Sequence, residues 1–347
     1  EMAHIILPIG LSFYIFHAIS YLIDIYRKEA LPARNLIDFS AFIALFPHLV
    51  AGPVLRYHLL AEQFHHRVHS WSNFSRGCTI FMVGFCKKVL IADTVAPLAD
   101  AAFAIKNPSM MDAWLGTIAY TIQLFFDFSG YTDMAIGLAL MIGFVFPQNF
   151  NDPYTSKSIT EFWQRWHMSL SSWLREYLYI PLGGNKKGTR RTYINLFLTM
   201  LLGGLWHGAN WTFVVWGAWH GGILAIERYL KSKFGDSILP SWLRIIKTML
   251  LVMIGWIFFR AIDLNNALQM LRGLIGLNGF NFSNMMEWQI EPDRLGILFV
   301  AIFLVYAMPW LHRYRGGPMR YLLIPLFFWA VATLSAQNFT PFLYFQF

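Results

Sequence analysis

Charged residues are scarce in this chain of 347 residues. Asp, Glu, Lys and Arg make up 13% of it, whereas hydrophobic residues make up 56% and the mean hydropathy is +0.46. A soluble domain carries roughly twice that charged fraction, so the composition excludes an ordinary soluble protein and indicates an integral membrane protein. The net charge of +8 does not indicate nucleic-acid binding, because Lys and Arg form short clusters between apolar runs and no continuous basic face.

Cysteine is almost absent, and so are the common catalytic signatures. Cys78 and Cys86 are the only cysteines, and on one helix they would lie ~12 Å apart along its axis, too far for a disulfide. The sequence therefore predicts no disulfide framework, no CxxC metal site and no indispensable thiol nucleophile. No GxSxG, Walker or HExxH motif is present, so hydrolase, nucleotide-driven and familiar metal chemistries lack their signatures.

One segment has metal-like spacing, the run HHRVH at residues 65–69. Arg67 lies in its middle, and no carboxylate or cysteine cluster completes it. We therefore interpret the segment as a basic loop near anionic headgroups and predict no metal site. The chain also opens at Glu1 without a basic segment before its first apolar run, which predicts that it has no signal peptide.

Apolar runs recur along the chain, several of them interrupted by Pro, Gly or charged residues. A membrane-spanning helix needs about 20 predominantly apolar residues, so the runs predict roughly eight to ten membrane segments in one all-α domain over residues 1–347. An amphipathic helix is expected at residues 265–276, and a bent or re-entrant segment around Pro47 and Pro53. The apolar runs lie at residues 5–26, 38–55, 77–105, 114–146, 195–226, 248–259, 295–311 and 321–336.

The stretch from Ser158 to Gly222 contains three histidines in apolar surroundings. Ionisable residues at membrane depth are costly, so each is a candidate functional residue. Residues 158–180 predict one amphipathic helix, which begins at a capping box formed by Ser158 and Glu161. The basic loop that follows is predicted to be cytoplasmic by the positive-inside rule, and its cations are Lys186, Lys187, Arg190 and Arg191.

Residues 195–226 predict two short helices joined at residues 206–210. Two similar pentapeptides occur here, GLWHG at 204–208 and GAWHG at 217–221. Each is a GxxxG frame, which lets helices approach closely. Close packing of this kind would bring His207 or His220 to a narrow internal cavity.

The residues in this stretch suit acyl transfer. A neutral histidine can remove a proton from an alcohol as the alcohol attacks an acyl carbon. The oxyanion that forms needs donors, for which Asn210, the Trp206 indole and the backbone amides around Gly208 are candidates. Spacing alone does not choose among the three histidines, His167, His207 and His220. Two aspartates of the run at 114–146, Asp127 and Asp133, must face polar groups.

Several motifs resemble the membrane-bound O-acyltransferase family, in particular its bacterial polysaccharide branch. The strongest are EFWQRWHMSLSSWLREYLYIPLGG and LLGGLWHGANWTFVVWGAWHGG. The resemblance extends to LPIGLSFYIFHAISYLIDIYR, LFPHLVAGPVLRY, LFFDFSGYTDMAIG and the closing PFLYFQF. Members of this branch carry further membrane helices before the LPIG motif, so those helices are expected to be absent from this sequence or not covered by it.

The resemblance implies a fold and a set of site residues. The fold is a ring of tilted and broken membrane helices around a central tunnel, open to the donor on the cytoplasmic side and to the acceptor on the outer side. The histidine of the WHG motif, His207, is implied to be catalytic, and that of the RWHMSLS motif, His167, to accompany it. The supporting candidates are Asp127, Asn210, Trp206 and Arg165.

The resulting hypothesis is a multi-pass O-acetyltransferase of the bacterial inner membrane, with no bound cofactor and no metal. Acetyl-CoA is the expected donor, an exported alginate-like polysaccharide the acceptor, and periplasmic SGNH-type proteins the partners, besides the lipid bilayer. One alternative is D-alanyl transfer to teichoic acid by the same fold. A second is a transporter or channel, against which the lack of an inverted repeat counts.

Overall fold

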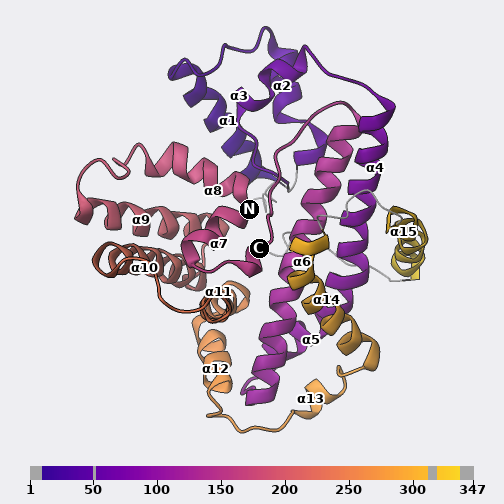
Figure 1. Ribbon diagram of the computed structural model, residues 1–347, viewed down its shortest axis with the longest axis vertical. Helices are drawn as coiled ribbons and strands as arrows, with labels where there is room; N and C mark the ends of the chain where they lie inside the picture. Colours follow the sequence, from indigo (N-terminus) through magenta and orange to yellow (C-terminus); the bar gives the residue numbers. More distant parts are fainter. Residues whose placement is uncertain (1–9, 50–51, 312–318, 337–347) are drawn as a thin grey trace, which may run out of the picture.

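The computed structural model describes residues 10–49, 52–311 and 319–336. Within these ranges every regular element is helical and no strand is present, so the all-α prediction is confirmed there (Figure 1). The helices of the first half are α1 (Leu11–Tyr26), α2 (Leu36–Ile43), α3 (Tyr57–Leu60), α4 (Trp71–Cys86), α5 (Asp93–Ala104) and α6 (Met110–Met141). Those of the second half are α7 (Ile159–Arg165), α8 (Met168–Leu174), α9 (Thr189–His207), α10 (Trp211–Phe234), α11 (Ser241–Arg260), α12 (Leu264–Leu274), α13 (Asn284–Glu287), α14 (Pro292–Leu311) and α15 (Met319–Ala336).

The longest described helix is α6, with 32 residues, and it packs along α4 and α5 (Figure 1). It begins at a complete capping box, in which Ser109 and Asp112 each accept a hydrogen bond from the other's backbone N–H. Glycines bring α4 and α6 close together. A methyl group on Gly137 would lie 2.6 Å from the carbonyl oxygen of Gly77, so these helices pack through the small residues that membrane helices favour.

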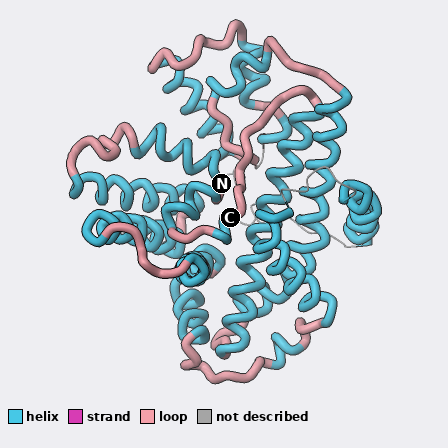
Figure 2. The backbone as a smooth tube through the Cα atoms, viewed as in Figure 1, coloured by secondary structure: helices cyan, strands magenta, loops and turns pink. Residues whose placement is uncertain are grey.

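The connection from α6 to α7 returns through the middle of the molecule, as the pink loop in Figure 2 shows. It runs back along α6. Phe150 packs edge-on against Phe128 with ring centroids 5.1 Å apart, and the Tyr154 hydroxyl donates to the carbonyl oxygen of Thr121 at 2.8 Å. This loop therefore lies between α6 and the elements that follow it in the sequence.

Helices α9 and α10 form a tightly packed hairpin. The predicted break at 206–210 is confirmed, because α9 ends at His207 and α10 begins at Trp211. The glycines of the two pentapeptides lie at the contact. A methyl group on Gly217 would lie 2.6 Å from the carbonyl oxygen of Met200, so α10 approaches α9 as closely as the GxxxG frames predicted.

The prediction of one continuous helix over residues 158–180 is wrong. Its start at Ser158 is confirmed, since the Ser158 hydroxyl accepts from the Glu161 N–H at 3.0 Å. The helix ends at Arg165, however, and α8 begins only at Met168. The returning loop accounts for the break. The Met168 N–H donates to the backbone oxygen of Asn149, and the Asn151 N–H donates to the backbone oxygen of Arg165, both at 2.9 Å. These bonds to the loop take the place of hydrogen bonds within a continuous helix.

Two helices in the described ranges are long and apolar enough to cross a membrane, at Ser241–Arg260 and Pro292–Trp310. Three further apolar helices are shorter, at Leu11–Tyr26, Leu36–His48 and Tyr321–Ala336. The predicted apolar runs thus form helices, and the run with Pro47 is broken as expected. The number of crossings and the ring around a tunnel stay predictions. The PFLYFQF segment lies outside the described residues.

Candidate active site

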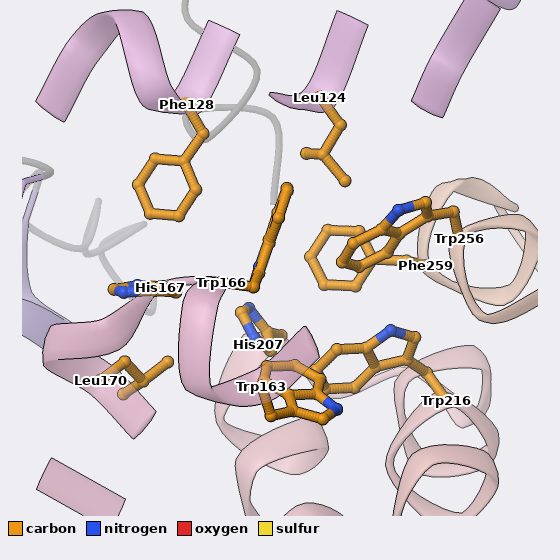
Figure 3. A pocket seen from close by; sticks show the side chains of 10 residues that line it. All are labelled: Leu124, Phe128, Trp163, Trp166, His167, Leu170, His207, Trp216, Trp256 and Phe259. Carbon is orange, nitrogen blue, oxygen red and sulfur yellow. The ribbon is translucent and has the colours of Figure 1, made fainter. Parts of the chain in front are cut away.

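A small cavity of about 20 Å³ lies where α6, α7, α8, α9, α10 and α11 meet. That volume is enough for about one water molecule. Aromatic rings form most of its wall, and the imidazoles of His167 and His207 also line it (Figure 3). The lining residues are Leu124, Phe128, Trp163, Trp166, His167, Leu170, His207, Trp216, Trp256 and Phe259.

His167 reaches the cavity because it sits in the break between α7 and α8. Its backbone is left-handed, with φ 43° and ψ 55°, a conformation that is uncommon outside glycine and that recurs at functional sites. The side chain is buried, with 2% of its surface exposed. Its Nδ1 lies 3.2 Å from Asn149 Oδ1, whereas its Nε2 has no hydrogen-bond partner among the described residues.

His207 is the last residue of α9 and is only partly buried. The extended residue Gly208 turns the chain away, so the imidazole projects from the helix end into the cavity. Its ring packs edge-on against Phe259 at 4.9 Å and Trp216 at 5.2 Å between centroids. The same cavity is lined by the imidazole of His167. Two histidines that are 40 residues apart in the sequence thus share one apolar cavity.

His220 does not line this cavity. It is fully buried in α10, and its Nδ1 accepts a hydrogen bond from the Trp163 indole N–H at 3.4 Å. Because an indole N–H only donates, the proton of a neutral His220 must be on Nε2. A methyl group on Gly255 would lie 2.5 Å from that Nε2. His220 therefore holds α7, α10 and α11 together and has no lone pair free to accept a proton.

The structure places one supporting candidate near the imidazoles. The indole of Trp206 packs against His207, with ring centroids 4.7 Å apart, and against Phe16 at 4.9 Å. Its buried N–H has no hydrogen-bond partner among the described residues. Trp206 is therefore a donor beside the cavity wall, in the cluster that includes α1 and α8.

Like Trp206, the remaining supporting candidates are not among the residues that line the cavity. Asp127 pairs with Lys88 of the π-helical segment at Lys87–Ala92, with an oxygen–nitrogen distance of 2.8 Å. Arg165 pairs with Glu161 at 2.7 Å. Asn210 caps α10 and donates its amide to the carbonyl oxygen of Ile262 at 2.8 Å. Of the two roles predicted for Asp127, helix packing fits its position, and Asp133 likewise pairs with a lysine, Lys87, at 2.6 Å.

Sequence reasoning missed the groups that hold His167. Asn149 and Ser169 both contact its imidazole, and neither was singled out as a candidate. Ser169 lies within the RWHMSLS motif, so its proximity to His167 gave a usable signal. Asn149 is 18 residues earlier, in the returning loop, and no local pattern connects it to the histidine.

Comparisons with known proteins agree with this arrangement of motifs. Residues 26–271 match the membrane-bound O-acyltransferase family. A probable alginate O-acetylase of Azotobacter vinelandii is 49% identical over 385 aligned residues, which cover 100% of this chain and 77% of that protein. Its counterpart in Pseudomonas putida is 51% identical, over 100% of this chain and 76% of the relative. A peptidoglycan O-acetyltransferase of Helicobacter pylori is 36% identical over 89% of this chain and 64% of that protein.

The family match covers well over half of the chain, and both histidine motifs lie within it. The chain belongs to the membrane-bound O-acyltransferase family.

Proposed function

We propose that the protein is a membrane O-acetyltransferase that moves acetyl from acetyl-CoA toward hydroxyls of an exported, alginate-like polysaccharide. The observation that carries the proposal is the meeting of His167 and His207 at one apolar cavity. The names of the relatives support acetyl as the acyl group and a polysaccharide as the acceptor.

In the proposed reaction His207 is the general base. Its imidazole takes the proton of an acceptor hydroxyl while the oxygen attacks the thioester carbon. The tetrahedral intermediate then collapses, the carbon–sulfur bond breaks, and the imidazolium returns the proton to the departing thiolate. General-base assistance of this kind typically contributes about 10² to 10⁴ in rate.

Two further groups complete the proposed site. His167 is the second polar group, with Nε2 available to accept a hydrogen bond from the incoming hydroxyl. The Trp206 indole N–H and the backbone amides around Gly208 are the proposed donors to the oxyanion. The aromatic wall limits the entry of water, which would otherwise hydrolyse the acyl group. Because the cavity admits only about one water-sized group, lining side chains move aside when the substrates enter.

The arrangement in the membrane is part of the proposal. The protein is multi-pass in the bacterial inner membrane, and its helices surround a tunnel through which acetyl passes. The donor enters on the side of the basic loop at residues 186–191, which is cytoplasmic by the positive-inside rule. On the outer side, SGNH-type periplasmic proteins complete the transfer to the polymer. The protein needs no bound cofactor and no metal for this chemistry.

A donor assay separates the proposal from its alternatives. Purified protein in liposomes is supplied with an acceptor polysaccharide and with either acetyl-CoA or a D-alanyl carrier protein, and release of the free thiol is measured. We expect turnover of acetyl-CoA that depends on His207. Turnover of the carrier protein alone would instead indicate D-alanyl transfer, and solute flux without any acyl transfer would indicate a transporter.

Variants of His220 test whether the site is confined to the other two histidines. In His220→Asn the amide oxygen replaces Nδ1 and still accepts from Trp163, so we expect acetylation within about twofold of the wild type. His220→Leu leaves the Trp163 N–H unpaired, which costs about 1–3 kcal/mol and lowers the thermal unfolding temperature in detergent. Acetylation by His220→Asn as low as that of a His207 variant would contradict the assignment.

A further inference from the structure

Three donors converge on a single side-chain oxygen beside the cavity, Asn149 Oδ1. The Ser169 backbone N–H lies 3.1 Å from it, the Ser169 hydroxyl 2.9 Å, and His167 Nδ1 3.2 Å. Asn149 is itself buried, with 1% of its surface exposed. A buried amide oxygen with three donors around it is a rigid acceptor, because each bond restricts its position.

This geometry determines which nitrogen of His167 carries the proton. A backbone N–H only donates, so the Ser169 N–H identifies the nearby Asn149 atom as the carbonyl oxygen and not the amide nitrogen. An oxygen of this kind only accepts. The Ser169 hydroxyl lies nearer to Asn149 Oδ1, at 2.9 Å, than to His167 Nδ1, at 3.4 Å, and so donates to the oxygen. His167 Nδ1 then donates to the same oxygen at 3.2 Å. This leaves the lone pair of the neutral ring on Nε2, the atom without a partner among the described residues.

Asn149 and Ser169 are held by two further hydrogen bonds. The backbone carbonyl oxygen of Asn149 accepts from the Met168 N–H at 2.9 Å, so the backbone of the returning loop is fixed to the start of α8. The Ser169 hydroxyl, which donates to Asn149, accepts in turn from the Val54 N–H at 2.8 Å. The loop, α8 and the segment before α3 thus support one orientation of the His167 ring.

We propose that Asn149 is a positioning residue, whose side-chain oxygen fixes the tautomer and the ring orientation of His167 so that Nε2 faces the cavity as an acceptor. The inference rests on the proposed function, since it assigns Asn149 a role in the acetyl transfer at that cavity. An imidazole with the opposite tautomer would present an N–H to the cavity and would repel the proton of an incoming hydroxyl. The same role accounts for the left-handed backbone of His167. That conformation places the ring so that Nδ1 meets Asn149 while the ring still lines the cavity.

The test compares two substitutions of Asn149. Leucine has a similar size but no acceptor, so we expect Asn149→Leu to lower kcat for acetyl transfer about 10²-fold while KM changes less than about threefold. Asn149→Asp keeps an oxygen for all three donors, and we expect its kcat within about tenfold of the wild type. Rates are measured in inverted membrane vesicles and normalised to the amount of folded protein.

Asn195→Leu is the matched control. Asn195 is also fully buried and donates to the carbonyl oxygens of Leu182 and Gly184, but it does not line the cavity. We expect this variant to lower the unfolding temperature without the selective loss of kcat. If Asn149→Leu does not fold, Ser169→Ala removes one of the three donors and is expected to lower kcat about three- to tenfold.

Four results would overturn the inference. The first is a wild-type kcat in Asn149→Leu, or in Ser169→Ala if Asn149→Leu does not fold. The second is a loss of kcat in Asn149→Asp as large as that in Asn149→Leu, and the third is an equal loss of kcat in Asn195→Leu. The fourth is a wild-type protein that transfers no acetyl. Only the last of these also rejects the proposed function. An active wild type with an unimpaired Asn149→Leu variant rejects the positioning role alone.

Discussion

Cells that produce His207→Ala in place of the wild-type protein are expected to export polymer without acetyl esters. The physical reason is that alanine removes the proposed base and leaves the apolar wall of the cavity in place. Loss of a general base alone lowers the rate about 10² to 10⁴-fold, which brings acetylation below detection in most ester assays. The measurement is the acetyl content of the exported polymer.

The folding control for this variant follows from the position of His207. The residue is partly exposed and ends its helix, so alanine there loses the ring contacts with Trp216 and Phe259 but interrupts no helix and buries no unpaired polar group. We expect the amount of protein in the membrane and its unfolding temperature in detergent to stay close to those of the wild type. Substantial acetyl ester on the polymer of a strain in which His207→Ala is the only copy would reject His207 as the base.

Gly217→Val is expected to prevent stable folding. The Cβ atom would lie 2.6 Å from the carbonyl oxygen of Met200 and 2.9 Å from Leu201 Cα. Both are backbone atoms of α9, so no side chain can rotate away and the two helices must separate. Overpacking of this kind costs roughly 1–3 kcal/mol or more, and here it also displaces His207 at the end of α9. We expect a large loss of detergent-extractable, monodisperse protein.

Gly222→Ala provides the comparison on the same helix. A Cβ atom at Gly222 has no heavy atom within 4 Å, and alanine is about 0.5–1 kcal/mol more favourable than glycine inside a helix. This variant should express and unfold like the wild type or slightly better. Equal yields from Gly217→Val and Gly222→Ala would show that the close contact between α9 and α10 is not needed for folding.

Most helices could be predicted from the sequence because apolar runs and glycine frames are local signals. The apolar run at 195–226 contains residues that interrupt it, so the break between α9 and α10 was predictable. The pentapeptide at 204–208 indicated both the close contact with α10 and the histidine that ends α9. His167 and His207 were candidates on the same local grounds. Their catalytic roles stay predictions, whereas their meeting at one cavity is a structural observation.

What could not be predicted depends on contacts between distant segments. The amphipathic pattern of 158–180 is continuous, so it indicated a single helix; the hydrogen bonds from residues 149 and 151 interrupt it. The same loop supplies Asn149 to His167. From the sequence, Asp127 could orient an imidazole or pack a helix, and its ion pair with Lys88 depends on a segment that no local pattern connects to it.

The central claim is that acetyl crosses the membrane by a transfer reaction at the cavity, and that this reaction requires His207. Inverted inner-membrane vesicles test it most directly, because they expose the cytoplasmic face to added donor and enclose the polymer and its periplasmic partners. Labelled acetyl-CoA is added outside, and label esterified to the enclosed polymer is measured over time. We predict His207-dependent accumulation of acetyl ester in the wild-type vesicles and none in those with His207→Ala. Equal accumulation in both, or uptake of intact donor without ester formation, would contradict the account.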